Sequence, residues 1–153
     1  MDQRHYALTP HIAGSYREAV SVCFNRHHSS PIEVALSDNG KSRVAELAWL
    51  APDARTSGAW ANEIDATEAG AYACVIAAVE LMRNFYAVRR CETGTGADYY
   101  IGPQGSGQND LEECLRLEEL SRLIPFDNVR QFVRITWSRW EMFCQRLSRS
   151  FNA

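Results

Sequence analysis

The chain has 153 residues, a length typical of one domain, and 46% of them are hydrophobic and 23% charged. This composition argues against a disordered chain, a collagen-like repeat or a disulfide-rich miniprotein. The net charge of −3 does not indicate a general affinity for nucleic acid. No apolar run is long enough for a transmembrane helix, and the N-terminus lacks the apolar segment of a signal peptide, so we expect a cytoplasmic protein without a membrane partner.

The first predicted elements are a helix and a hairpin. Apolar residues recur every three or four positions over residues 10–26, and Thr9 can cap the helix that this spacing indicates. Two strands are expected next, over residues 32–36 and 42–50. The turn signal Asp38-Asn39-Gly40 lies between them and favours an antiparallel pair.

A loop and a long helix are predicted in the middle of the chain. Residues 51–64 contain proline, serine and glycine and are expected to form a loop that Trp60 docks on the core. A helix is expected over residues 66–87. Asp65 and Glu68 fit a capping box at its start, with each side chain bonding the backbone of the other.

Two short strands and a final helix complete the predicted elements. Residues 97–101 indicate a strand, and residues 114–118 favour a strand over a helix because Leu115 and Leu117 can share one face. From Asn128 onward, apolar residues recur at helical spacing and predict a long amphipathic helix. We therefore expect one α+β domain over residues 1–153, with a small mixed sheet of about four strands flanked by three helices.

Charge is distributed unevenly along the chain. Residues 65–127 carry five basic and eleven acidic groups, whereas residues 128–153 carry five arginines and one glutamate. Arginines bind phosphates and aromatic rings stack on bases or pack in protein interfaces, so the final helix is a candidate contact surface for nucleic acid or for a protein partner, including a second copy of the chain. The candidate contact residues are Arg130, Arg134, Arg139, Trp137 and Trp140.

Three acidic residues stand at or near the ends of predicted elements: Glu68, Asp98 and Glu118. Carboxylate oxygens are the ligands that Mg²⁺ prefers, and such an ion can activate water and stabilise charge on a phosphate. Each residue also has a structural explanation. Glu68 can serve the helix cap, Asp98 can bond the backbone of the glycine turn before it, and Glu118 can pair with Arg116 or Arg122.

The order of these elements resembles the core of the restriction-endonuclease-like nucleases, the PD-(D/E)xK superfamily. Glu68 on a helix, Asp98 after Gly96-Ala97 and Glu118 on a later strand are the matching residues, within residues 65–150. The resemblance implies a metal-dependent phosphodiesterase with Asp98, Glu118 and Arg116 as catalytic residues. It also implies that Glu68, Asp98 and Glu118 bind Mg²⁺ or Mn²⁺. The segment Gly94-Thr95-Gly96-Ala97-Asp98-Tyr99 is similar to a segment of uncharacterised bacterial proteins as well.

The chain departs from this superfamily at its final motif, because Leu120 stands where the motif has lysine. Arginine stays protonated and cannot replace lysine as a base, and the single lysine of the chain, Lys41, lies in the predicted hairpin. We therefore expect a nucleic-acid phosphodiesterase or an inactive derivative of one. The alternative is a non-catalytic interaction module, a subunit of a bacterial multi-protein system that docks through its C-terminal aromatic helix.

Overall fold

The structure is a computed structural model, and it describes residues 4–107, 111, 114–117 and 133–134. In chain order the described elements are α1 (Pro10–His27), β1 (Ile32–Asp38), β2 (Lys41–Leu47), α2 (Ala54–Ala59), α3 (Glu63–Arg83), β3 (Tyr86–Arg90), β4 (Tyr99–Gly102), β5 (Leu115–Leu117) and β6 (Val133–Arg134). The predicted α+β class is confirmed. The strands form two sheets of three, ordered β2-β1-β6 and β3-β4-β5, in place of the single sheet of about four strands that we expected.

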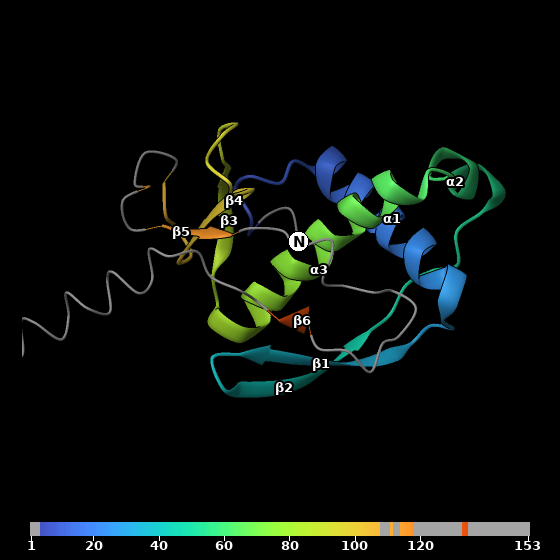
Figure 1. Cartoon of the computed structure of the whole chain (residues 1–153), viewed down its shortest axis with the longest axis horizontal. Coiled ribbons are helices and arrows are strands. Elements are labelled where there is room, and N and C mark those ends of the chain that lie inside the picture. The colour runs from blue at the N-terminus through green and yellow to red at the C-terminus, as the bar shows by residue number, and fades with distance from the viewer. Residues whose placement is uncertain (1–3, 108–110, 112–113, 118–132, 135–153) are drawn as a thin grey trace, which may run out of the picture.

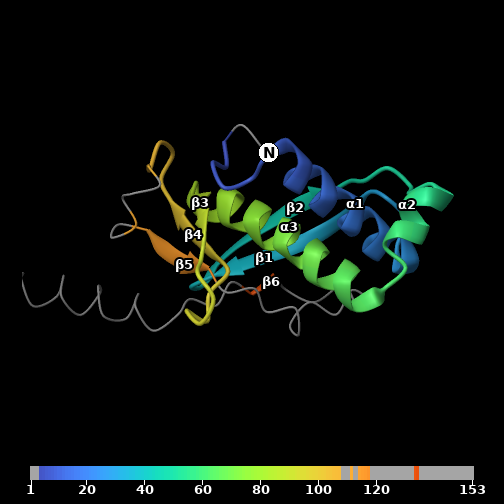
Figure 2. The same cartoon turned by 90° about the horizontal axis from the view of Figure 1, so that it is seen from above.

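The two long helices lie on one face of the β1–β2 hairpin (Figure 1). Figure 1 shows α1 and α3 crossing above the β1–β2 hairpin, with the β3-β4-β5 sheet at the end of α3 opposite α2. Figure 2 shows from above that α3 runs along the hairpin. A buried cluster draws its side chains from both helices and both sheets, including Tyr16, Leu36, Ile76, Tyr99 and Leu117. No helix in the described part of the chain is long and apolar enough to cross a membrane.

The first helix and the hairpin form as local signals predict. The side chain of Thr9 accepts a hydrogen bond from the Ile12 amide at 3.3 Å and caps α1. In the hairpin, Asn39 and Gly40 both have positive φ angles, 47° and 80°. Two such residues give a turn whose twist matches that of the flanking strands, so β1 and β2 pair in antiparallel register from Asp38 and Lys41 outward.

The middle of the chain corrects two predictions. Residues 51–64 are not all loop, because α2 forms there with Asp53 as its cap and α3 begins at Glu63. The capping box predicted from Asp65 and Glu68 is also wrong. The side chain of Asn62 caps α3 by accepting from the Ile64 amide at 3.0 Å, which places Asp65 inside the first turn. An earlier cap residue thus lengthens the helix at its N-terminal end.

The C-terminal end of α3 also differs from the prediction, which extended the helix to residue 87. The helix stops at Arg83 because Asn84 adopts a left-handed conformation, with φ of 57°. Tyr86 therefore lies in β3, a strand that local spacing did not predict. This strand is held by antiparallel pairing with β4, a contact between segments that are separated in sequence.

The later strands confirm part of the prediction. β4 and β5 begin and end within two residues of the expected bounds and pair in antiparallel register. The helix predicted from Asn128 onward is wrong at Val133–Arg134, which form β6 and pair in parallel with β1 at Leu36 and Ser37. Here pairing with the available edge of β1 outweighs helical periodicity. The rest of that predicted helix lies outside the described residues.

An ion pair fixes the hairpin to the end of α3. Asp38 is 5% exposed, and its carboxylate accepts two hydrogen bonds from Arg83, at 2.6 Å from Nε and 2.8 Å from Nη2. Arg43 on β2 donates to the carbonyl oxygen of Leu81 at 2.8 Å. Both arginines also meet the negative end of the α3 dipole, so the hairpin turn and the helix terminus stabilise each other.

Replacing Arg83 with methionine should lower the free energy of unfolding by about 3 kcal/mol, because it removes a two-bond partner from a buried carboxylate. Urea denaturation measures the loss. The matched control is Arg89→Met, which breaks the exposed Arg89–Glu92 pair and should cost less than about 1 kcal/mol. Equal losses in the free energy of unfolding of the two variants would show that the Asp38–Arg83 pair stabilises the fold no more than an exposed ion pair does.

Candidate functional site

An open cavity of about 390 Å³ lies where α3 meets the connection between β3 and β4. Its lining is mostly polar and comes from α3, from the end of β3 and from the glycine-containing loop that follows. The lining residues are Glu68, Tyr72, Arg90, Cys91, Glu92, Thr93, Gly94, Gly96, Ala97 and Asp98. Two of the three acidic residues singled out in the sequence, Glu68 and Asp98, therefore share one cavity.

Backbone hydrogen bonds hold Asp98 in place from both sides. Its carbonyl oxygen accepts from the Cys91 amide at 2.9 Å, and its own amide donates to the Leu117 carbonyl at 2.8 Å. The loop between Cys91 and Asp98 is closed by Thr95, whose hydroxyl contacts the carbonyl oxygens of Glu92 and Ala97 at 2.9 and 3.2 Å. The Asp98 carboxylate is thus presented by a fixed backbone, which a binding site requires.

The hydroxyl group of Tyr72 joins the two carboxylates. It lies 2.9 Å from Asp98 Oδ1 and 3.3 Å from Glu68 Oε1. A phenol has one proton, so it donates to one carboxylate at a time, and the shorter distance favours Asp98. Burial, together with the hydrogen bond to Asp98, raises the pKa of Tyr72 well above its ordinary value. Tyr72 therefore remains a donor at neutral pH and does not act as a base.

Arg90 supplies the positive charge of the site. Its Nη2 donates to the hydroxyl of Tyr72 at 3.2 Å, and its Nη1 donates to the hydroxyls of Tyr16 and Tyr99 at 3.1 and 3.5 Å. The hydroxyls of Tyr16 and Tyr99 are 2.7 Å apart. The guanidinium carbon lies 4.9 Å from the ring centroid of Tyr72 and 5.4 Å from that of Tyr99, within the range of cation–π attraction. One cation is thereby fixed beside two carboxylates.

The other predicted catalytic residues are placed differently. Arg116 on β5 pairs across the sheet with Tyr100, and its guanidinium carbon lies 5.8 Å from the Tyr100 ring centroid. It is not among the residues that line the cavity. Glu118 lies outside the described residues, so its place as a third ligand stays a prediction. The described residues contain no group of three His, Cys, Asp or Glu side chains that could hold a metal ion.

The predicted contact surface on the C-terminal helix is mostly outside the described residues. Of its members, only Arg134 is placed, in β6 beside Ser37 of β1, in the sheet that does not line the cavity. The members outside the described residues are Arg130, Arg139, Trp137 and Trp140. Contact of these residues with nucleic acid or with a protein partner stays a prediction.

Sequence reasoning missed the tyrosines and the arginine that organise the cavity. Tyr72 follows Glu68 by one helical turn, and this spacing places both side chains on one face of α3. This four-residue spacing can be seen in the sequence. It does not identify Tyr72 as a polar partner, because Tyr72 also fits the apolar face of the helix. No local pattern links Arg90 to Tyr16 or Tyr99, because the contacts depend on the packing of α1 and β4 against α3.

Comparison with known proteins gives no relative of this chain. No protein-family model matches it, and neither a curated protein nor a solved structure does. Its function must therefore be inferred from the side chains of the cavity.

Replacing Tyr72 with phenylalanine should lower the free energy of unfolding by about 1–2 kcal/mol, because the change removes the hydroxyl that bonds Asp98 and Arg90. Thermal or urea unfolding measures the loss. Tyr6→Phe is the control, because Tyr6 is 70% exposed and its hydroxyl can bond water. A Tyr72→Phe variant as stable as Tyr6→Phe would contradict an organising role for the hydroxyl.

Proposed function

We propose that the cavity is a metal-dependent phosphodiesterase site that acts on nucleic acid. Glu68 and Asp98 are the proposed carboxylate ligands of Mg²⁺ or Mn²⁺, and Arg90 is the proposed phosphate-binding residue. The observation that carries the proposal is the meeting of two carboxylates, from separate elements, at the hydroxyl of Tyr72. The resemblance to restriction-endonuclease-like nucleases supports the same assignment of Glu68 and Asp98.

The donor set suits a hard divalent cation. Mg²⁺ is commonly bound through one or two carboxylates, with water and substrate phosphate oxygens as its other ligands. Glu68 is exposed and Asp98 is half-buried, so both carboxylates are accessible from the cavity. An ion bound there would supply an activated water and stabilise negative charge on the phosphate.

The surrounding side chains have roles that follow from their contacts. Tyr72 orients Asp98 through the hydrogen bond at 2.9 Å. Arg90 stays charged at any physiological pH, and guanidinium groups pair with the oxygens of phosphate groups. Its position at the cavity favours it over Arg116 for the binding of phosphate. Neither Arg90 nor Tyr72 serves as the base, since both remain protonated.

Titration of Mn²⁺ into the protein by calorimetry tests the metal site. We expect one saturable binding event in the wild type, weakened at least about tenfold in Asp98→Asn and in Glu68→Gln because each variant loses a charged oxygen ligand. The control is Glu46→Gln, an equal change of charge at an exposed position on β2, and it should bind as the wild type does. Circular dichroism verifies that every variant is folded.

Two outcomes would overturn this function. Absence of saturable Mn²⁺ binding by the folded wild type would remove the metal site, and equal binding by Asp98→Asn would remove it from this cavity. If Mn²⁺ binds as expected, the next measurement is the cleavage of single-stranded DNA, double-stranded DNA, single-stranded RNA and double-stranded RNA in the presence of Mn²⁺. Cleavage of at least one of these substrates by the wild type, abolished in Asp98→Asn, supports the phosphodiesterase. If the wild type cleaves none of the four, the proposed activity is contradicted.

A further inference from the structure

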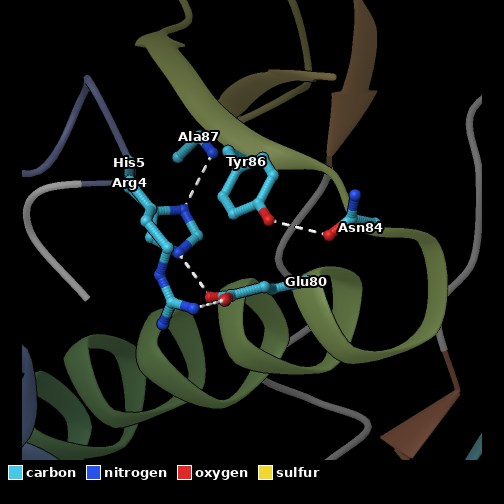
Figure 3. Close-up of polar contacts among 6 residues, drawn as sticks. All are labelled: Arg4, His5, Glu80, Asn84, Tyr86 and Ala87. Carbon is cyan, nitrogen blue, oxygen red and sulfur yellow. Dashed lines mark hydrogen bonds and ion pairs between the residues drawn. The ribbon is translucent and has the colours of Figure 1, made fainter. Parts of the chain in front are cut away.

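His5 is fully buried and bonds two separate elements. Figure 3 shows its imidazole between β3 and α3, with one nitrogen directed at the amide of Ala87 and the other at the carboxylate of Glu80. The Ala87 amide lies 3.0 Å from Nδ1, and Glu80 Oε2 lies 2.9 Å from Nε2. No solvent reaches the side chain, which is 0% exposed. Its two ring nitrogens are therefore committed to protein partners.

These two contacts define the protonation state of the ring. A backbone amide can only donate, so Nδ1 must carry a lone pair, and the single ring proton is on Nε2 and points at Glu80. The imidazole is thus neutral in the folded chain. A proton on Nδ1 would face the N–H of Ala87, and the hydrogen bond between them would be lost.

The same segment covers the free edge of β3. The described strands of this sheet are ordered β3-β4-β5, so one edge of β3 pairs with no described strand. The amide of Ala7 donates to the carbonyl oxygen of Ala87 at 3.0 Å, while the Ala87 amide donates to His5. Both backbone groups of Ala87 are therefore bonded by residues 5–7, which cover this part of the strand edge.

The charged groups that face His5 among the described residues are few. Glu80 on α3 contacts it directly, and Arg4 of its own segment pairs with the other oxygen of that carboxylate at 2.7 Å. On β3, the ring of Tyr86 lies 5.4 Å from the imidazole, and its hydroxyl donates to Asn84. Burial lowers the pKa of His5 below its ordinary value, against the hydrogen bond and charge of Glu80, which act in the opposite direction.

We propose that His5 is a proton-sensitive latch: uptake of a proton at Nδ1 breaks its bond to Ala87 and releases residues 4–7 from the edge of β3. The latch belongs to the strand that ends at Arg90, so its release exposes an edge of the sheet that borders the cavity. The inference does not depend on the proposed phosphodiesterase activity.

The direction of the pH effect follows from linkage. Because the folded chain binds a proton on His5 less readily than the unfolded chain does, the stabilisation is fully present above the ordinary histidine pKa of about 6.5. It is lost as the pH falls from there through the folded pKa. The latch is therefore closed at neutral pH and opens in mild acid.

Amide hydrogen exchange followed by NMR between pH 7 and pH 5 tests the latch. Protection factors correct for the pH dependence of intrinsic exchange. We expect the protection of the Ala7 and Ala87 amides to fall together by about tenfold or more, because protonation of His5 removes the acceptor of the Ala87 amide and detaches residues 4–7. The amide of Ile76, in the middle of α3, should keep its protection, since a local opening leaves the helix intact.

Two variants and one spectroscopic measurement complete the experiment. His5→Asn keeps an acceptor atom near the position of Nδ1 but cannot titrate, so the loss of protection in acid should disappear. His11→Asn removes an exposed histidine of α1 and should behave as the wild type does. Imidazole nitrogen shifts of the wild type report the His5 proton directly, even where His5→Asn does not fold.

Three results would overturn the latch. One is a His5 ring that titrates while the protection of Ala87 stays constant. The second is a loss of protection at Ile76 equal to that at Ala87, which would indicate global unfolding. The third is a folded His5→Asn variant that loses protection in acid as the wild type does. A failure of Mn²⁺ to bind has no bearing on any of these outcomes.

Discussion

The contact between Arg90 and three tyrosine hydroxyls is the interaction on which the cavity depends. The three tyrosines come from α1, α3 and β4, and Arg90 comes from the end of β3. The guanidinium lies at the exposed end of β3, where it donates to all three hydroxyls and lies over the rings of Tyr72 and Tyr99. The four elements therefore meet at Arg90. The hydroxyl of Tyr72 connects this point to Asp98 through a hydrogen bond.

Helix α3 makes polar contacts near both of its ends. Near its start, Glu68 and Tyr72 face the cavity. Near its end, Glu80 bonds His5 and Arg83 bonds Asp38. The contacts of Glu80 with His5, of Arg83 with Asp38 and of Tyr72 with Asp98 each connect the helix to a segment distant in the sequence. The helix thus serves as the common support of the hairpin, of the N-terminal segment and of the second sheet.

The chemistry proposed for the cavity follows from this arrangement of charges. A fixed cation beside two carboxylates can bind a phosphate and a divalent metal ion at neighbouring positions, and each is stabilised by the charge of opposite sign. The same arrangement holds Tyr72 protonated, so the phenol orients Asp98 and does not compete as a base. The His5 contact lies on the far edge of β3 from β4 and responds to protons through a separate set of bonds.

Local sequence signals determined the α1 helix, the Asn39-Gly40 hairpin and the position of Asp98 after a glycine turn, because caps, turns and short periodicities act between residues close in the chain. Tertiary structure alone decided that β3 and β6 are strands, because their backbone bonds go to β4 and β1. It also decided that Arg90 meets Tyr16 and Tyr99. These contacts join residues far apart in sequence, and no spacing along the chain encodes which distant partner will meet an arginine side chain or an open strand edge.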